Sequence, residues 1–328
     1  MIDLQNTFAD FSEKKILVLG DVMVDTYLTG SVTRISPEAP VPVVRFKSRE
    51  SRLGGAANVA MNIKALGAEP IICSVIGEDE EGDNFLRLLD QNKLRQEGIL
   101  RSSNLMTTVK TRIIGNNQQL LRIDHEEIIP LDDSLSKQLV ERVRSIILKE
   151  EIAAIIFEDY NKGVLVPDVI QKIIHLANEK GIITTVDPKK ENFFEYKNVT
   201  LFKPNLKELK EGTNTEFSIK DKSAFLNAVN ILITKLNPKH TFVTLSEHGV
   251  YINDEKQDHF IPAHYRLITD VSGAGDTVIS VATLCLACGL SAKLSAEIAN
   301  LAGGLVCEKV GVVSIDKEQL MNEALNLL

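Results

Sequence analysis

The sequence lacks the features that mark several large classes of protein. It carries no excess of positive charge, because 37 Lys and Arg residues stand against 45 Asp and Glu residues, for a net charge of −8. General nucleic-acid binding needs many Lys and Arg contacts to phosphate, so this class is disfavoured, although a local cluster of cations could still hold a small anion. No apolar run approaches the ~20 residues that a membrane-spanning helix needs. We therefore expect neither nucleic acid nor membrane as a partner.

Signals for secretion and for metal binding by cysteine are also missing. The first dozen residues include Asp3 and Asp10, and the first apolar run, 16–19, is too short for the core of a signal peptide. Of the four cysteines, Cys285 and Cys288 form a C-x-x-C within an apolar run, but no second pair and no His stand at zinc spacing. We interpret the pair as core residues of a helix. A reducing cytoplasm is the expected location.

Common motifs for nucleotide binding are absent as well. No G-x-x-x-x-G-K-[ST] loop occurs, which disfavours a P-loop kinase. Residues 20–25, GDVMVD, follow the first expected strand but lack the G-x-G-x-x-G of a nicotinamide dehydrogenase. The motif set of protein kinases is missing too. If this chain handles nucleotide phosphates, a different glycine turn has to bind them.

What the sequence has instead is a regular alternation of apolar strands and amphipathic helices. Strands are expected at 15–20, 70–77, 153–157, 182–187, 199–205 and 241–245, and helices at 54–66, 82–93, 134–149, 167–180 and 218–236. This pattern predicts an α/β fold with a Rossmann-like central, mostly parallel sheet and helices on both faces. Ligands of such sheets bind beyond the carboxyl ends of the strands. The polar side chains at those ends are Asp21, Asp25, Glu158, Asp159, Asp187, Asn205, Ser246 and Glu247.

Two segments have residue patterns that differ from those of the buried strands. Residues 107–123 alternate apolar and polar side chains around the turn GNNQ, which predicts a β-hairpin. Residues 40–46, PVPVVRF, are expected to be extended, because each residue before a proline is kept out of the helical region. We expect two excursions, at roughly 25–53 and 97–125, to form a small β-sheet lid on a single domain that spans 1–328.

The strongest chemical signal is the segment 270–277, DVSGAGDT, directly before an apolar helix. Its Gly-Ala-Gly run lets backbone N–H groups approach a phosphate, and the helix start adds the positive end of a dipole. Asp276 could take the proton of an attacking hydroxyl while these N–H groups stabilise the transferred phosphoryl group. The alternative interpretation is that Asp276 only caps the helix.

Together these motifs resemble the ribokinase family of carbohydrate kinases, the phosphofructokinase-B type. The segment 270–277 is similar to the C-terminal signature of that family, and residues 54–58, GGAAN, are similar to its paired-glycine motif. The resemblance covers essentially the whole chain and implies a ribokinase-like fold with a β-sheet lid, ATP and Mg²⁺. It implies Asp276 as the base, and as the anion hole the amides of Gly273, Ala274 and Gly275.

The same resemblance assigns roles to further residues. It implies sugar contacts from Asp25, Gly54, Gly55 and Asn58, and nucleotide contacts from Thr244, Ser246, Glu247, Gly249, Asn300 and Gly303. The alternatives are an Asn at a helix start for Asn58 and helix packing for the small residues near 303. Lys189, after Asp187 and Pro188, is a separate candidate for binding a substrate or nucleotide phosphate. Asn205 and Glu208 match the N-x-x-E motif that organises Mg²⁺ and phosphate, the alternative being a helix cap and an exposed Glu. Asp270 and Ser272, with backbone of 306–314, could hold a monovalent cation such as K⁺.

Three stretches, at 34–43, 117–124 and 159–163, resemble the heptose-7-phosphate kinases of lipopolysaccharide-precursor synthesis. This implies phosphorylation of the anomeric hydroxyl of D-glycero-D-manno-heptose 7-phosphate to the 1,7-bisphosphate, with substrate contacts from Arg34, Gln119, Arg122, Asp159 and Lys162. Bifunctional relatives carry a nucleotidyltransferase domain as well, and the chain end at Leu328 predicts the kinase alone. Cations in the lid segments fit a phosphorylated acceptor, although Lys and Arg also protect exposed sheet edges.

Two other functions compete with this prediction. One is a different sugar or sugar-phosphate kinase of the family, acting on ribose, fructose or a fructose phosphate. The other is a non-catalytic nucleotide or sugar sensor, which would be expected to carry a damaged DVSGAGDT motif, whereas the motif is intact here. Exposed lid strands also favour a homodimer that is joined through the lids.

Overall fold

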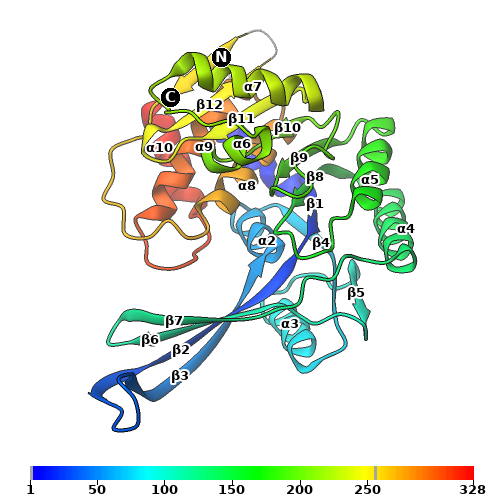
Figure 1. The fold of residues 1–328 in the computed structure, drawn as a ribbon. Helices are drawn as coiled ribbons and strands as arrows, with labels where there is room; N and C mark the ends of the chain where they lie inside the picture. The colour runs from blue at the N-terminus through cyan, green and yellow to red at the C-terminus, as the bar shows by residue number, and fades with distance from the viewer. Residues whose placement is uncertain (1–2, 255–256) are drawn as a thin grey trace.

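The computed structural model describes residues 3–254 and 257–328, and Figure 1 shows them as a layered α/β body from which a β-sheet extends. The main sheet has nine strands in the order β13-β12-β11-β10-β9-β8-β1-β4-β5. Their bounds are β1 Lys15–Gly20, β4 Glu69–Gly77, β5 Ile99–Ser102, β8 Ile152–Glu158, β9 Ile183–Asp187, β10 Leu201–Phe202, β11 His240–Thr244, β12 Val250–Asn253 and β13 Asp258–Ile261. All pairings are parallel except those of β12 with β11 and β13.

Helices cover both faces of this sheet, which explains why its strands are almost continuously apolar. One face packs against α1 Leu4–Asp10, α2 Ala56–Ala65, α3 Glu80–Gln91, α8 Ala274–Ala287, α9 Ala292–Cys307 and α10 Lys317–Leu327. The other packs against α4 Asp133–Lys149, α5 Pro167–Glu179, α6 Leu206–Thr213 and α7 Lys222–Leu236. Two short 3₁₀ turns, Phe11–Glu13 and Ser246–His248, complete the set. The predicted α/β fold class is confirmed.

Two predicted boundaries in the main body need correction. The helix expected at 54–66 begins at Ala56, because Gly54 and Gly55 complete a lid strand, and Gly55 has a positive φ of 61° that few other residues adopt. The strand expected at 199–205 is limited to Leu201–Phe202. Pro204 cannot donate a hydrogen bond to a neighbouring strand, so the chain leaves the sheet there.

The lid is a four-stranded sheet in the order β3-β2-β6-β7. Its strands are β2 Val22–Ile35, β3 Pro42–Gly55, β6 Val109–Gly115 and β7 Gln118–His125. Asn116 and Asn117, both at positive φ, form the predicted hairpin turn between β6 and β7. The expectation that the lid includes residues 97–108 is wrong, because β5 in this range pairs with β4 at the edge of the main sheet and buries Ile99.

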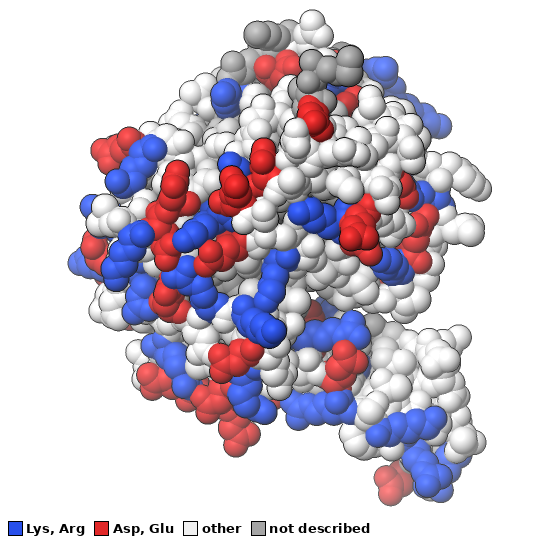
Figure 2. Space-filling view, turned by 180° about the vertical axis from the view of Figure 1, so that it is seen from behind, with Lys and Arg blue, Asp and Glu red and all other residues white. Residues whose placement is uncertain are grey.

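The lid exposes apolar side chains as well as charged ones. Its exposed large apolar residues are Ile35, Val41, Phe46, Leu120, Leu121 and Ile123. In Figure 2 the lid projects at the lower right as a largely uncharged surface with basic and acidic side chains near its end. Elsewhere on that face Lys and Arg are interspersed with Asp and Glu. Among the described residues, none of the helices combines the length and apolar character required to traverse a lipid bilayer.

Candidate active site

Asp276 lies in the first turn of α8, at the carboxyl edge of the main sheet. Gly273 precedes the helix with φ 79°, a left-handed conformation that glycine adopts without strain. The Asp276 carboxylate accepts no hydrogen bond from the helix amides, so it does not cap α8 through its side chain, although its charge lies in the first turn. Asp276 instead faces a cavity of about 650 Å³, which it lines together with Gly275 and Tyr160.

Two side chains hold the Asp276 carboxylate from opposite parts of the chain. The Asn58 amide donates to Oδ2 at 2.6 Å, and the Tyr160 hydroxyl donates to Oδ1 at 3.0 Å. Burial raises the pKa of Asp276 to about 6, and the hydrogen bond from Asn58 opposes that rise. Burial also raises the pKa of Tyr160 well above its usual value, so its phenol stays a proton donor. Asp276 is therefore mostly ionised at neutral pH and can accept a proton.

The predicted anion hole is only partly free. The Ala274 amide donates to the Val271 carbonyl at 3.3 Å, which closes a turn around the left-handed Gly273. Inclusion of Ala274 in the anion hole is thus not supported by this structure. The amides of Gly273 and Gly275 make no hydrogen bond within residues 3–254 and 257–328, and Gly275 lines the cavity. These two N–H groups, with the helix dipole, remain available for an anion.

A second, smaller cavity of about 270 Å³ lies beside the first, under the base of the lid. Asp25 and Asn58 line it, and so do Tyr27 and Arg52. Asn58 lines the smaller cavity and Asp276 the larger one, so their hydrogen bond links the walls of the two cavities. Asp276 is thus placed between two chambers, as a base between two substrates would be.

Asp25 is buried at the lid base and forms an ion pair there. Arg112 on β6 donates to its Oδ1 at 2.5 Å. A Cβ atom on Gly54 would lie 2.4 Å from Asp25 Oδ2, so the glycine leaves this carboxylate its space. Gly55 has a similar function, since a Cβ there would lie 2.4 Å from the Asp21 carbonyl oxygen. The paired glycines therefore allow two strands to approach closely under the smaller cavity.

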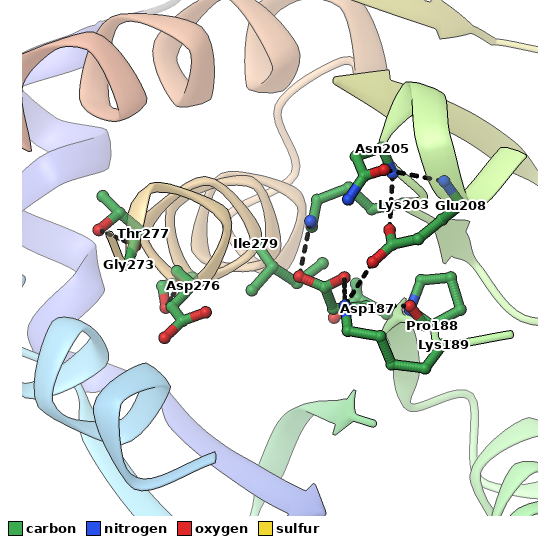
Figure 3. A network of polar contacts seen from close by, with 12 residues as sticks. Asp187, Pro188, Lys189, Lys203, Asn205, Glu208, Gly273, Asp276, Thr277 and Ile279 are labelled. Carbon is green, nitrogen blue, oxygen red and sulfur yellow. Dashed lines mark hydrogen bonds and ion pairs between the residues drawn. The ribbon is translucent and has the colours of Figure 1, made fainter. Parts of the chain in front are cut away.

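Three buried carboxylates cluster beside the larger cavity, which Asp187 and Asp276 line: one oxygen from each of Glu158, Asp187 and Asp276 lies within 4.8 Å of the others. Lys203, whose side chain is only 2% exposed, pairs with Asp187 at 2.7 Å (Figure 3). Glu158 Oε2 has no hydrogen-bond partner within the described part of the chain. Burial and the neighbouring carboxylates Asp187 and Asp276 raise the pKa of Glu158 well above its usual value. This concentration of negative charge suits a bound cation.

Asn205 and Glu208 form a capping box at the start of α6. The alternative interpretation, a helix cap and an exposed Glu, is therefore right about the cap. The Asn205 side chain accepts from the Glu208 amide, and Glu208 Oε2 accepts from the Asn205 amide. Glu208 is buried rather than exposed, and its other oxygen pairs with Lys189 (Figure 3). Asn205, Glu208 and Lys189 all line the larger cavity, together with Thr244 and Ser246.

Four predicted nucleotide contacts do not line this cavity. Glu247 is exposed beside it, and Gly249, at φ 86°, shapes the turn by lying against the Ile261 carbonyl. Asn300 donates to the Pro262 carbonyl at 2.8 Å. Gly303 makes close packing of α9 on α8 possible, since a Cβ there would lie 2.8 Å from Val278. The structure thus gives Gly249 and Gly303 a backbone role.

Two of the predicted sugar contacts, Asp159 and Lys162, are bonded to other groups of the protein. Asp159 is fully buried and accepts from Tyr196 at 2.7 Å and from the Asn161 amide at 2.8 Å, so its assignment as a direct substrate contact does not fit. Lys162 pairs with Glu126 near the lid base.

Three lid residues lie outside both cavities. Gln119 and Arg122 are exposed on β7, where Arg122 pairs with Asp124. Arg34 is nine residues beyond Asp25 on β2, a distance of roughly 30 Å along a strand. Within one chain Arg34 does not reach Asp276.

The candidate cation site at 270–272 is organised by backbone amides. The Asp270 carboxylate accepts from the Ser272 amide and from the Gly311 amide, each at 2.9 Å. Burial alone would raise the pKa of Asp270, but these amides hold it below its usual value. Asp270 therefore joins the 306–314 segment to the turn before α8, with Ser272 contributing its amide, and the assignment of a cation to this place stays a prediction.

Sequence reasoning missed several residues of the site. Tyr160 lies inside the stretch 159–163, but only the fold shows its contact with Asp276. Lys203 directly precedes the Pro-Asn of the N-x-x-E motif, and its burial has no local signal. Glu158 and Asp187 were noted as strand-end residues without a role, and Arg112 has no local signal for its pairing with Asp25. In each case the missing information is a contact between distant segments.

Comparison with known proteins relates this geometry to a family. A model of the pfkB family carbohydrate kinases matches residues 13–319. The bifunctional protein HldE of Helicobacter pylori strain HPAG1 is 40% identical over 308 residues, 94% of this chain and 65% of that protein. The HldE of Methylobacillus flagellatus is 42% identical over 309 residues, 94% of this chain and 62% of that protein. The chain thus spans less than two thirds of the length of these relatives.

Two solved structures show the same fold. Phosphofructokinase-2 from Escherichia coli in complex with potassium superposes with a TM-score of 0.78 at 20% identity, covering 96% of this chain and 99% of that one. Ribokinase from Arabidopsis thaliana complexed with ribose and ATP gives a TM-score of 0.70 at 16% identity, again covering 96% and 99%. At these identities the likeness concerns the fold.

Proposed function

We propose, from the premise that the chain belongs to the pfkB family of carbohydrate kinases and is an ATP-dependent sugar kinase, that its acceptor is D-glycero-D-manno-heptose 7-phosphate. The product would be the 1,7-bisphosphate, a precursor of ADP-heptose and lipopolysaccharide. Support comes from the HldE relatives and from the three sequence stretches that resemble heptose-7-phosphate kinases. The observation that carries the chemistry is the position of Asp276 at the junction of two cavities.

The acceptor sugar occupies the smaller cavity in this proposal. Asp25 Oδ2 and the Asn58 side chain bind its hydroxyls, and the anomeric hydroxyl points to Asp276. Arg112 holds the Asp25 carboxylate in place, because its guanidinium donates to Oδ1 at 2.5 Å and leaves Oδ2 for the sugar. Asp276 takes the hydroxyl proton as the oxygen attacks the terminal phosphoryl group of ATP. The amides of Gly273 and Gly275 stabilise the charge on that group.

The nucleotide phosphates occupy the larger cavity, where Lys189 lies on the wall. The family implies Mg²⁺ with ATP, and the unpartnered Glu158 Oε2 among three clustered carboxylates fits a divalent cation. Asp187, Glu158 and Glu208 would hold it, directly or through water, and leave Asp276 free as the base. When bound, Mg²⁺ offsets the negative charge of the phosphates. Closure of the lid over the sugar excludes water and limits hydrolysis of ATP.

Three finer points belong to the same proposal. K⁺ binds near Asp270 and the 306–314 backbone, which would make turnover higher with K⁺ than with Na⁺.

Two chains associate through the exposed apolar lid strands, since such surfaces favour contacts between copies. A sedimentation mass of one chain would contradict this dimer. The reaction takes place in the cytoplasm, where ATP is supplied.

The acceptor assignment is tested by an assay of ADP release with a panel of sugars. We expect heptose 7-phosphate to give the highest kcat/KM, ahead of ribose, fructose and fructose 6-phosphate, because the site has to bind both a sugar and its phosphate. Each acceptor should be compared with a blank that contains ATP alone. A higher kcat/KM with fructose 6-phosphate would replace the heptose assignment with a phosphofructokinase activity, and release with none of them would favour a sensor.

The pH dependence of kcat/KM should report the ionisation of Asp276. The base acts only when it is ionised, and its pKa is raised by burial to about 6. The rate should therefore be constant above that pH and fall about tenfold per unit as the pH decreases below it. Measurement between pH 5 and 8 with saturating ATP would show this limb. A limb near pH 4, the range of an exposed Asp, would contradict the buried position of the base.

A further inference from the structure

Arg52 occupies a junction between the lid and the main body. It lies near the end of β3, directly opposite Asp25 in the β2–β3 register, and lines the smaller cavity. Its Nη1 donates to the Val312 carbonyl at 3.3 Å, and Nε donates to Glu50. A Cβ atom on Gly311 would lie 3.8 Å from the same Nη1. This lid arginine therefore contacts the 306–314 segment across the cavity.

On the sugar side, Arg52 is connected to Asp25 through an aromatic ring. The Arg52 guanidinium carbon lies 5.1 Å from the centre of the Tyr27 ring, and that of Arg112 lies 5.3 Å from it. Arg112 in turn pairs with Asp25. Planar guanidinium groups stack well on aromatic faces, so a change in the position of one affects the other. A ligand that binds Asp25 can therefore change the position of the Arg52 side chain through Arg112 and Tyr27.

On the phosphate side, Val312, which accepts the Arg52 hydrogen bond, packs against the turn that precedes α8. A Cβ atom on Gly273 would lie 3.1 Å from Val312 Cγ1, so the Val312 side chain packs directly on this glycine. The neighbouring Gly311 amide donates to Asp270 at 2.9 Å. The position of residues 311–312 thus influences the orientation of the Gly273 amide.

We infer that Arg52 is a positioning residue that couples binding of the acceptor sugar to binding of the nucleotide phosphates. The inference rests on the proposed use of the smaller cavity by the acceptor. Arg52 is 42% exposed and its bond to Val312 is long, so water competes for both groups in the free protein. A sugar in the cavity excludes that water, strengthens the bond and orders the turn that receives the phosphoryl group.

The test is the coupling factor between the two ligands. Calorimetry gives the Kd of a non-hydrolysable ATP analogue with Mg²⁺, with and without the acceptor, and the ratio is the coupling factor. The acceptor probe is whichever sugar of the panel is turned over, so failure of the heptose assignment is seen separately and leaves this test intact. We expect a factor of about 5–150 for the unchanged protein and below about 2 for Arg52→Ala.

Two variants and a second readout serve as controls. Arg49→Ala removes another β3 arginine, whose partner is Glu81, and should retain the coupling. Arg52→Lys keeps the positive charge but loses the planar group that stacks on Tyr27, so it should retain only part of the coupling. Hydrogen exchange of the amides at 311–314 should slow on addition of the acceptor alone, but not in Arg52→Ala. Full coupling in Arg52→Ala, equal loss in Arg49→Ala, or no coupling in the unchanged protein would each overturn the inference.

Discussion

Asp276→Asn is expected to lower kcat by about 10²–10⁴-fold, the usual contribution of a general base. An amide is similar in size to a carboxylate but cannot accept the hydroxyl proton, and the Asn58 and Tyr160 hydrogen bonds supply no replacement base. The Kd of ATP should change little, because the amides of Gly273 and Gly275 are unaltered. Steady-state kinetics together with calorimetric titration of the nucleotide separate these two effects.

A matched control addresses the helix-cap alternative. Asp316 caps α10, where its side chain accepts from the Gln319 amide, and Asn is an equally good cap residue. Asp316→Asn should therefore leave kcat unchanged. If Asp276→Asn behaved in the same way, Asp276 would have no role as the base.

Lys203→Met is expected to lower the free energy of unfolding by about 3–5 kcal/mol, the loss typical of a buried ion pair deprived of one partner. Burial lowers the pKa of Lys203, but Asp187 and Glu208 more than offset this and hold it above its usual value, so the residue is charged. Without it, Asp187 would lose its buried ion-pair partner while it lies beside Glu158 and Asp276 in the same cluster. Denaturant unfolding, monitored by circular dichroism, measures the loss.

The neighbouring Lys207 provides the comparison. It lies on the first turn of α6 with its side chain 81% exposed. Lys207→Met should change the free energy of unfolding by no more than about 0.5 kcal/mol. Equal stabilities of the two variants would mean that Lys203 does not compensate the carboxylates. Partial recovery in Lys203→Met/Asp187→Leu would identify the unpaired Asp187 charge as the cause of the loss.

The sequence predicted the fold well because the fold depends on local patterns. Apolar strands and amphipathic helices alternate with periods that can be read directly, and the Asn116–Asn117 turn has a conformation that these residues favour. The errors occurred where the outcome depends on pairing. Residues 99–102 could extend the lid or the main sheet by their composition, and the parallel partner β4 decides between them.

The candidate site was predicted in part for the same reason. Asp276 and its glycine turn form one continuous motif, and Asn58 belongs to another. The engagement of the Ala274 amide by Val271 and the pairing of Asp25 with Arg112 are properties of the folded backbone. Tyr160, Lys203 and Arg52 gained their proposed roles only when segments far apart in the sequence were brought together. Their identities alone carry no sign of these contacts.

The account depends on transfer of a phosphoryl group across the junction at Asp276. Its most direct test is a crystal structure with heptose 7-phosphate, Mg²⁺ and a non-hydrolysable ATP analogue. We predict that the anomeric oxygen lies within about 2.6–3.2 Å of an Asp276 carboxylate oxygen, with the terminal phosphate beside the Gly273 and Gly275 amides. A sugar bound outside the smaller cavity, with Asp276 still enclosed by Asn58 and Tyr160 and away from any hydroxyl, would contradict the account.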